Sequence, residues 1–243
     1  MATWIVHLRL TENLLPLIHG LDASYFAIGS IAPDSGIPDE NWENFTPPPE
    51  VSHFKASGGS ARELADMDFY RRYLQSVDEV SNDPLRFSFL LGYFFHLVTD
   101  NEWSQKVGQP TQARFAEEFD ADPEFIWEVK RDWYGLDFDY VRKHRDSIFW
   151  TVFLKTAYTH DYIDFLPQEA VQQRIAYIKE LYQKTDEEIE EWYIDRPNLY
   201  LLQEDMDDFV SGTTDILYAI YQQLWEKGAD HSDLTSALGL IGR

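Results

Sequence analysis

The sequence predicts an all-α protein, and three observations support this fold class. Apolar residues recur three and four positions apart in several long segments, which is the spacing of an amphipathic helix. We find no alternation of strands with helices, no internal repeat and no low-complexity tract. The 8 Trp, 14 Tyr and 16 Phe residues supply the bulky side chains that pack the core of a helical bundle. We therefore expect a single helical bundle.

Length and composition set the number of domains and the kinds of metal ligand. The chain has 243 residues, enough to bury a sizeable core, and no change of composition divides it, so we expect one domain over 1–243. It contains no Cys, which rules out disulfides and thiolate ligands. Any metal must therefore be held by His nitrogens and carboxylate oxygens.

The charge balance argues against several classes of partner. With 43 acidic and 20 basic residues the formal charge is −23, which repels nucleic acid and the anionic inner face of a membrane. Screening acts over about 8 Å at physiological salt, so a small anion can still enter a cationic site. The longest apolar stretch, around Leu85 to Val98, carries a His and is too short to span a bilayer. The N-terminus lacks the features of a signal peptide, so we expect a cytoplasmic protein without membrane insertion.

Two predicted helices matter most for the site. The first lies at the N-terminus, where Trp4, Leu8 and Ile18 recur at roughly helical spacing, and it is expected to bend or break near Thr11 or Pro16. The second opens at Asn82-Asp83-Pro84, a cap followed by a proline in the first turn, and runs through LRFSFLLGYFFHLVTDNEW. It is apolar nearly all round, which predicts a central position in the bundle.

The remaining helices fill the second half of the chain. A capping box at Thr185 and Glu188 predicts a short acidic helix, and Gly228 is placed to end the last long helix in the left-handed conformation. The predicted ranges are 111–120, 123–133, 138–158, 167–183 (opened by Pro167) and 202–227.

A long segment from Ala27 to Ser60 follows the first helix and shows no regular period. It is rich in Gly, Pro, Asn and Asp, which predicts a loop. An ordered loop of this length inside a compact domain usually has a function, and otherwise it is a disordered linker. Its aromatic and aliphatic residues, among them Ile31, Trp42 and Phe54, indicate that it packs onto the body of the bundle.

His96 and Asp100 are the first candidate metal ligands. They lie four residues apart on the central helix, so both side chains face the same side and can reach one ion. Gly92, one turn earlier, leaves room beside them. A buried carboxylate costs several kcal/mol unless a cation or a metal pairs with it, and Lys and Arg are absent between Arg86 and Lys106. Two alternatives stay open, namely an exposed Asp100 at a helix end and a His96–Asp100 hydrogen bond without metal.

Three further residues complete the candidate set. Asp34 and His53 lie in the long loop, and a metal bound at both places would keep that loop ordered. Taken alone, Asp34 also fits a turn residue in PDSG. His7 lies on the apolar side of the first helix, where a satisfied core histidine is the alternative to a ligand.

The order of these residues resembles a known superfamily. His7, a Gly-x-Ile-Ala-Pro-Asp segment ending at Asp34, then His53, then His96-x-x-x-Asp100 on an apolar helix is similar to the zinc-dependent phospholipase C and P1-type nuclease superfamily. The resemblance covers about the first 105 residues. It implies an all-α bundle of that type, with the long loop after the first helix anchored by a zinc cluster.

The resemblance also implies roles for the matching residues. Asp34, His53, His96 and Asp100 would surround one zinc, and Asp100 would bridge to a second ion that His7 also holds. The nucleophile would be a metal-bridging water, and Asp34 would double as its general base. The implied activity is a zinc-dependent phosphoesterase, a hydrolase, with two Zn²⁺ ions. Manganese and iron accept the same donors, so ligand type alone leaves the metal open among these three.

This sequence departs from the superfamily in two ways. Secreted members bind metal through the free amine and carbonyl of an N-terminal Trp, whereas Trp4 is internal here. A third zinc in the family uses a further His and a His-x-x-x-Glu or His-x-x-x-Asp pair. The later candidates here, His144 and His160-x-x-x-Asp164, are displaced along the chain and read equally well as solvated faces.

The net charge favours a small phosphate ester over a polynucleotide as substrate. Two alternatives stay open. The adjacent His160 and Asp161, with Asp215 on a later helix and His144 as the earlier His, suggest an HD-type phosphohydrolase. A metal that only fastens the long loop to the bundle would make the protein a non-catalytic, metal-stabilised helical protein, because structural sites fill every position with protein ligands.

Overall fold

The computed structural model describes residues 1–243 except 42, 56–62, 78–82, 186–187, 190–196 and 243. The described chain is mostly helical, and its one small sheet pairs two strands of two residues each. The prediction of an all-α fold is therefore confirmed, while the phospholipase C/P1 nuclease type stays a prediction. Among the described residues, no helix has the length and apolar character needed to cross a bilayer.

Helix α6, Pro84–Trp103, forms the centre of the bundle, as predicted. Asp83 caps it by accepting a hydrogen bond from the Arg86 N–H, and Pro84 occupies the first turn. Every residue from Phe87 to Trp103 is buried. Because this helix is enclosed on all sides, any polar side chain on it must find its partner inside the protein.

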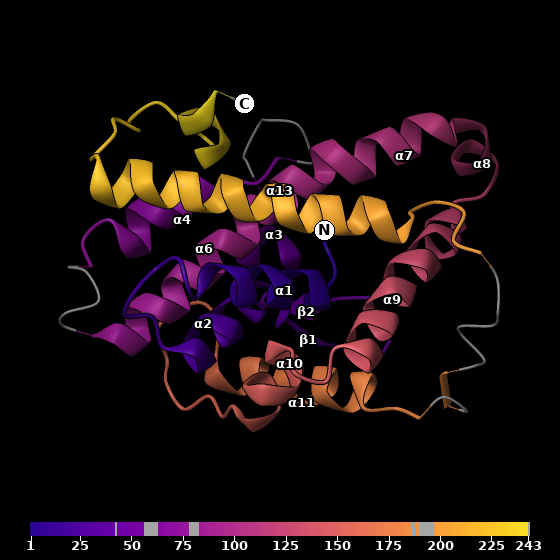
Figure 1. Ribbon diagram of the computed structural model, residues 1–243, viewed down its shortest axis with the longest axis horizontal. Helices are drawn as coiled ribbons and strands as arrows, with labels where there is room; N and C mark the ends of the chain where they lie inside the picture. Colours follow the sequence, from indigo (N-terminus) through magenta and orange to yellow (C-terminus); the bar gives the residue numbers. More distant parts are fainter. Residues whose placement is uncertain (42, 56–62, 78–82, 186–187, 190–196, 243) are drawn as a thin grey trace.

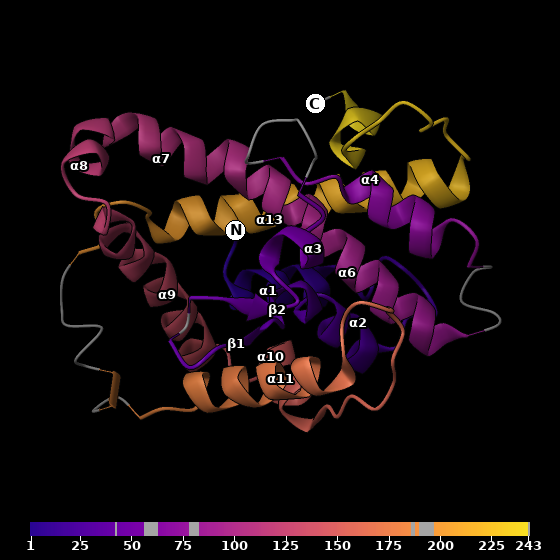
Figure 2. The same cartoon turned by 180° about the vertical axis from the view of Figure 1, so that it is seen from behind.

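Helices α1, α2 and α13 pack around α6 (Figures 1 and 2). The first, Trp4–Leu14, ends just before Pro16, as expected. Helix α2, Ala23–Gly29, crosses α6 at very close range. A Cβ atom added to Gly29 would lie 2.0 Å from the Phe89 carbonyl oxygen, and one added to Gly92 would lie 2.4 Å from that of Phe26. Both glycines are therefore required for this crossing.

The segment predicted as helices 123–133 and 138–158 is organised differently. Helix α9 runs without a break through Phe125–Lys143. Its buried Val129, Trp133 and Leu136 continue the same face past Gly135, so packing overrides the low helix propensity of that glycine. The predicted division of this segment into helices 123–133 and 138–158 was therefore wrong. After α9 the structure has a single turn, α10 (Ile148–Thr151), and a 3₁₀ turn, η4 (Phe153–Lys155).

The other helices lie close to their predicted ranges. The range 111–120 is divided at Phe115 into α7 (Gln109–Arg114) and α8 (Ala116–Ala121), and a π-helical turn, η3 (Ser104–Gly108), joins α6 to α7. Helix α11 spans Gln168–Tyr182, and α13 spans Gln203–Tyr221 before a π-helical turn, η5 (Gln222–Glu226), and a later 3₁₀ helix, η6 (Ala237–Ile241). Gly228 adopts φ +58°, as predicted for the residue that ends this helix.

From α2 to the start of α6 the chain contains short elements that the sequence analysis did not predict. These are α2 itself, the 3₁₀ turn η1 (Ala32–Asp34), the strand pair β1 (Ile37–Pro38) and β2 (Phe45–Thr46), and α3 (Pro49–Ser52). They are followed by α4 (Asp66–Phe69) and the π-helical turn η2 (Tyr70–Leu74). The expectation of a segment without secondary structure was therefore wrong. The short acidic helix expected after Thr185 falls largely outside the described residues.

Asp137 on α9 joins the start of α1 to the end of α11. Its two oxygens accept hydrogen bonds from the Thr3 hydroxyl at 2.7 Å and the Tyr182 hydroxyl at 2.6 Å. Burial raises the pKa of Asp137 to about 7, although these two hydrogen bonds oppose the rise. The charged carboxylate is thus less stable in the folded chain than in the unfolded one.

Replacing Asp137 with asparagine tests this assignment. The folded pKa lies above the unfolded value, so the free energy of unfolding of the wild type should fall as pH rises from about 4 to about 7 and then level off, at about 1.4 kcal/mol for each unit of pKa difference. Asp137→Asn removes the titration but keeps an acceptor, so its stability relative to the wild type should improve from pH 5 to pH 8. Urea denaturation at pH 5 and at pH 8 measures the free energy of unfolding, and Asp139→Asn, at a partly exposed residue, is the control. If the difference between Asp137→Asn and the wild type is the same at both pH values, the raised pKa of Asp137 is contradicted.

Candidate metal centre

The structure brings the five candidate residues together from four segments. His7 lies on α1, Asp34 ends η1, His53 follows α3, and His96 and Asp100 lie one turn apart on α6. Two groups of three, namely His7, His96, Asp100 and Asp34, His53, His96, have donor atoms within 4.8 Å of one another. Each group could hold a metal ion.

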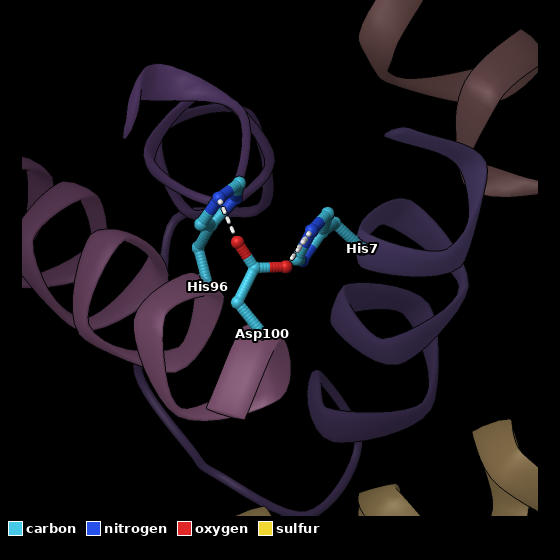
Figure 3. A group of neighbouring side chains, drawn as sticks. All are labelled: His7, His96 and Asp100. Atoms are coloured by element: carbon cyan, nitrogen blue, oxygen red, sulfur yellow. Dashed lines mark ion pairs between the residues drawn. The ribbon is translucent and has the colours of Figure 1, made fainter. Parts of the chain in front are cut away.

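Asp100 lies in the middle of the cluster. Its Oδ1 is 3.5 Å from His7 Nε2, and its Oδ2 is 3.4 Å from His96 Nε2 and 3.9 Å from His53 Nε2. Figure 3 shows the carboxylate between His7 and His96, with one oxygen turned toward each. A carboxylate placed in this way can serve two ions, one on each side.

The histidine rings lie close together. The rings of His7 and His96 are stacked with centroids 3.9 Å apart, and those of His53 and His96 are 5.4 Å apart. A metal ligand must reach within about 2.0 to 2.1 Å of zinc, so rings far apart would have ruled out a common site. The convergence expected from the sequence is therefore present, while the binding of metal stays a prediction.

Unpartnered donor atoms indicate that the cluster is built for a cation. His7 Nε2, His53 Nε2, His96 Nε2 and Asp100 Oδ2 are all buried and have no hydrogen-bond partner among the described residues. A buried polar atom without a partner costs about 1–3 kcal/mol. Four of them facing one another are the donor set that a divalent ion with nitrogen and oxygen ligands requires. The residues present thus fit a metal.

The number of ions follows from the donors. His96 belongs to both groups of three, yet its Nε2 has one lone pair and can bind one ion. If His96 joins Asp34 and His53, the second ion is left with His7 and Asp100 Oδ1 among the described side chains. An ion on the His7 side would therefore have the weaker set of ligands.

Backbone groups orient the ligands, and sequence analysis did not predict them. His96 Nδ1 lies 2.8 Å from the Ser30 carbonyl oxygen, so Nδ1 carries the proton and Nε2 presents its lone pair to the cluster. His53 Nδ1 is 3.0 Å from the Ser52 hydroxyl. The Ala2 N–H donates to Asp100 Oδ1 at 2.8 Å. As a peptide N–H has no lone pair for a metal, Ala2 orients Asp100 and does not act as a ligand.

Asp34 is held by two partners. Its Oδ1 is 3.2 Å from His53 Nε2, and its Oδ2 accepts a hydrogen bond from the Trp4 indole at 2.8 Å. Trp4 thus contributes to the site through its side chain rather than as a terminal ligand. Its position three residues before His7 places both on one side of α1, which is a signal that the sequence contained.

Burial and the local charges set the ionisation of the histidines. Burial and the nearby positive charge of His96 lower the pKa of His7 to about 4, although Asp100 acts in the opposite direction. For His96, burial lowers the pKa, but Asp100 and Asp34 raise it on balance above its ordinary value. His7 is therefore neutral at physiological pH and able to bind an ion, whereas protonation of His96, which is favoured more than in an ordinary histidine, would compete with metal binding.

The two carboxylates are ionised. Burial would raise the pKa of Asp34, but the close contact with His53 at 3.2 Å and the charges of His96 and His53 hold it well below its usual range. Burial also acts against ionisation of Asp100, but the charges of His96 and of the N-terminal amine, together with the contacts to His7 and His96, hold that pKa well below its usual range. Both side chains therefore present the anionic form that a metal prefers.

The alternative of an exposed Asp100 at a helix end is wrong. Asp100 is 3% exposed, and α6 continues past it to Trp103. A network of His–Asp ion pairs without metal is the remaining alternative. Its contacts of 3.4, 3.5 and 3.9 Å around Asp100 are longer than good hydrogen bonds of about 2.7–3.2 Å, which favours an ion between the groups.

The later candidates lie away from this cluster. His144 stacks on Tyr140, and His160 is exposed and lies 2.6 Å from the Tyr25 hydroxyl. Asp164 is bound by Arg72 and Tyr73. None of these joins a group of possible metal ligands among the residues that the structure describes.

The aspartates expected for an HD-type phosphohydrolase, Asp161 and Asp215, likewise have other surroundings. Asp161 accepts a hydrogen bond from the Gln168 N–H at the start of α11, at 2.9 Å, and Asp215 is exposed on α13. The described contacts of these residues therefore give the HD-type alternative no support.

Comparison with protein-family models, with curated proteins and with solved structures gives no match. The interpretation of the site consequently rests on its geometry and on the residue order described above.

Proposed function

We propose that the chain is a zinc-dependent hydrolase that cleaves a small phosphoric ester with a water activated at the His/Asp cluster. The observation that supports this most is the convergence of four buried, unpartnered donor atoms, three from histidines and one from Asp100. The order of the five residues, which resembles the phospholipase C and P1-type nuclease superfamily, points to the same chemistry.

The chain's residues divide the work of binding. Asp34, His53, His96 and Asp100 would hold one ion, and His7 with Asp100 would hold the other. When bound, such ions lower the pKa of a water and neutralise the charge that develops on a phosphoryl oxygen. Ser30 fixes the tautomer of His96, and the Ala2 N–H fixes the orientation of Asp100.

Asp34 is the residue proposed as general base. Its Oδ2 faces the Trp4 indole, and its side chain is the most exposed of the five at 11%, so it is the carboxylate that an entering water meets first. The low pKa of Asp34 makes it a weak base. Its contribution would therefore lie mainly in orienting the water and accepting a proton from an already acidified one.

A non-catalytic role is the second candidate, and burial is the observation that favours it. The side chains of His7, His53, His96 and Asp100 are at most 3% exposed. A metal enclosed in this way would fasten α1, α3 and η1 to α6 and stabilise the fold.

The cytoplasmic location expected from the sequence stays a prediction.

Metal analysis combined with an ester screen tests these proposals. The purified protein should contain zinc, and it should hydrolyse a phosphomonoester or a phosphodiester in a manner that a strong chelator abolishes and added zinc restores. A His160→Ala variant, altered at an exposed histidine outside the cluster, should behave like the wild type. Bound metal without hydrolysis of either ester class would favour the structural role. A protein that takes up no divalent metal would overturn both.

A further inference from the structure

Asp34 is the ligand of the cluster that lies nearest to solvent. Asp34 is 11% exposed in its side chain, whereas the other four ligands are at most 3% exposed. A substrate must therefore approach past Asp34. The residues packed around Asp34 decide which substrates can reach the cluster.

Aromatic rings from three helices gather on the Asp34 side of the cluster. Trp4, whose indole is bound to Asp34, lies with its ring centroid 6.4 Å from that of Tyr134 on α9 and 5.8 Å from that of Tyr177 on α11. Tyr177 is 42% exposed. Strand β1 lies between α9 and α11 (Figure 2). The approach to Asp34 is thus lined by rings, of which Tyr177 is the most accessible.

Arg174 lies among these rings. Its guanidinium carbon is 5.4 Å from the centroid of the Trp4 ring and 5.6 Å from that of Tyr177. One nitrogen, Nη2, makes a long hydrogen bond of 3.4 Å to the Gly36 carbonyl oxygen, and Nε has no partner in the described part of the chain. Because Nε is buried, a ligand would have to be bound through the Nη nitrogens of the guanidinium.

Lys130 supplies a second positive charge. It lies four residues before Tyr134 on α9, so both side chains share one face of that helix. It is partly buried, and its ammonium lies 4.7 Å from the centroid of the Trp127 ring on the same helix. Burial lowers its pKa, while the charge of Asp34 acts in the opposite direction. Within the described ranges, neither Lys130 nor Arg174 has a carboxylate within 4.0 Å.

Arg174 and Lys130 contact aromatic rings rather than carboxylates, in a chain of formal charge −23. Six other Lys and Arg side chains are paired with carboxylates, namely Arg9, Lys55, Arg71, Arg72, Arg131 and Lys143. A guanidinium offers paired N–H donors that match two phosphate oxygens, and an ammonium adds a compact charge. This combination is the chemistry that recognises a phosphate.

We propose that Arg174 and Lys130 form an anion subsite on the Asp34 side of the cluster, which binds the phosphate of an ester whose organic group is planar and stacks on Tyr177. This subsite rests on the proposed function, whose substrate class it narrows to aryl or heteroaryl phosphates. Arg174 and Lys130 hold the phosphate oxygens that do not react. Tyr177 packs against the organic group, where stacking tolerates any flat ring.

Titration with inorganic phosphate tests the subsite. Calorimetry on the zinc-loaded protein should give a dissociation constant that rises at least about tenfold in Arg174→Met and a few-fold in Lys130→Met, as expected for losing a hydrogen bond to a charged group. Arg174→Lys keeps the charge but loses the paired donors, so its dissociation constant for phosphate should lie between those of the wild type and Arg174→Met. Arg131→Met, at an exposed position of α9 where Arg131 pairs with Glu128, is the matched control and should be unchanged.

Thermal unfolding of the same variants separates binding from packing. If Arg174 only braces the Trp4 and Tyr177 rings, Arg174→Met should lower the melting temperature while phosphate affinity stays at the wild-type value, and that result would overturn the subsite. The organic group is tested with phenyl phosphate and methyl phosphate. The wild type should bind phenyl phosphate more tightly, and Tyr177→Ala should lose this preference. Equal binding of the two esters by the wild type would contradict the stacking on Tyr177.

Metal content measured on the same samples distinguishes the two proposals. A protein that binds zinc and hydrolyses esters, but whose Arg174 and Lys130 variants bind phosphate like the wild type, would overturn the subsite alone. A protein that takes up no zinc would overturn the proposed function. Phosphate titration of that metal-free protein still decides the subsite, because Arg174 and Lys130 are not metal ligands, and equal affinities in all variants would reject it.

Discussion

Asp100→Asn should remove most of the bound metal, whereas His7→Ala should remove only the ion on the His7 side. Asp100 faces His7 with Oδ1 and His96 and His53 with Oδ2, so its charge serves both ions. His7 would contribute to only one of the two ions. Groups outside the direct ligands are already worth 10–100-fold in metal affinity. We therefore expect losing this carboxylate to weaken binding by more than about a hundredfold.

The variant is chosen to leave the fold in place. Asparagine has the size of aspartate and keeps an oxygen that can accept the Ala2 N–H. Metal content per chain, measured after equilibration with buffered zinc, is the readout, and far-UV circular dichroism checks the helices. Asp139→Asn, at an exposed residue paired with Lys143, is the control. If Asp100→Asn and His7→Ala retain the same amount of metal, Asp100 does not bridge two ions.

Periodicity and capping residues predicted the long helices well. The cap at Asp83 and the proline that follows it located the start of α6, and Pro167 located the start of α11. The apolar pattern of α6 also indicated its central position, because a helix without a polar face can be stable only when it is enclosed. These features depend on local sequence and on burial alone.

Local sequence was a poor guide where packing decides. Separate helices were predicted on either side of Gly135, yet the buried face of α9 continues through it, since the contacts of Val129, Trp133 and Leu136 outweigh the propensity of one residue. The short elements between α2 and α6 are one or two turns long. Such elements show no period, and they are held by contacts with residues distant in the sequence.

The candidate ligands could be predicted, but their surroundings could not. His and Asp are rare enough in apolar segments for their order to be informative. The groups that orient them include the Ser30 carbonyl and the Ala2 N–H, which every residue possesses and no sequence pattern marks. Arg174 and Tyr134 lie beside Trp4, the residue that binds Asp34, only because the fold brings α11 and α9 to the start of α1. Their distance in sequence from the motif concealed them.

Removing the metal should loosen the segment from Ala27 to Ser60 while the helices persist. The structure narrows the expected protease-sensitive region to part of this segment. Ile31 and Ala32 are fully buried against the core, whereas the stretch 37–51 is mostly exposed and is followed by His53 at the cluster. We therefore expect new protease cleavage between 37 and 51. Since binding energy confined to the folded site adds to stability, about 4 kcal/mol at a thousandfold excess over the dissociation constant, chelation should also lower the melting temperature.

Limited proteolysis with and without a strong chelator, read by mass, measures the cut sites, and zinc added back should restore protection. The His160→Ala variant should show the same response as the wild type. The contacts without metal are modest: the Tyr93 hydroxyl donates to the Ser52 carbonyl at 2.5 Å, and β1 and β2 pair over two residues each. If cleavage in this stretch is unchanged when the metal is demonstrably gone, these contacts suffice to hold the segment, and its order provides no argument for a metal.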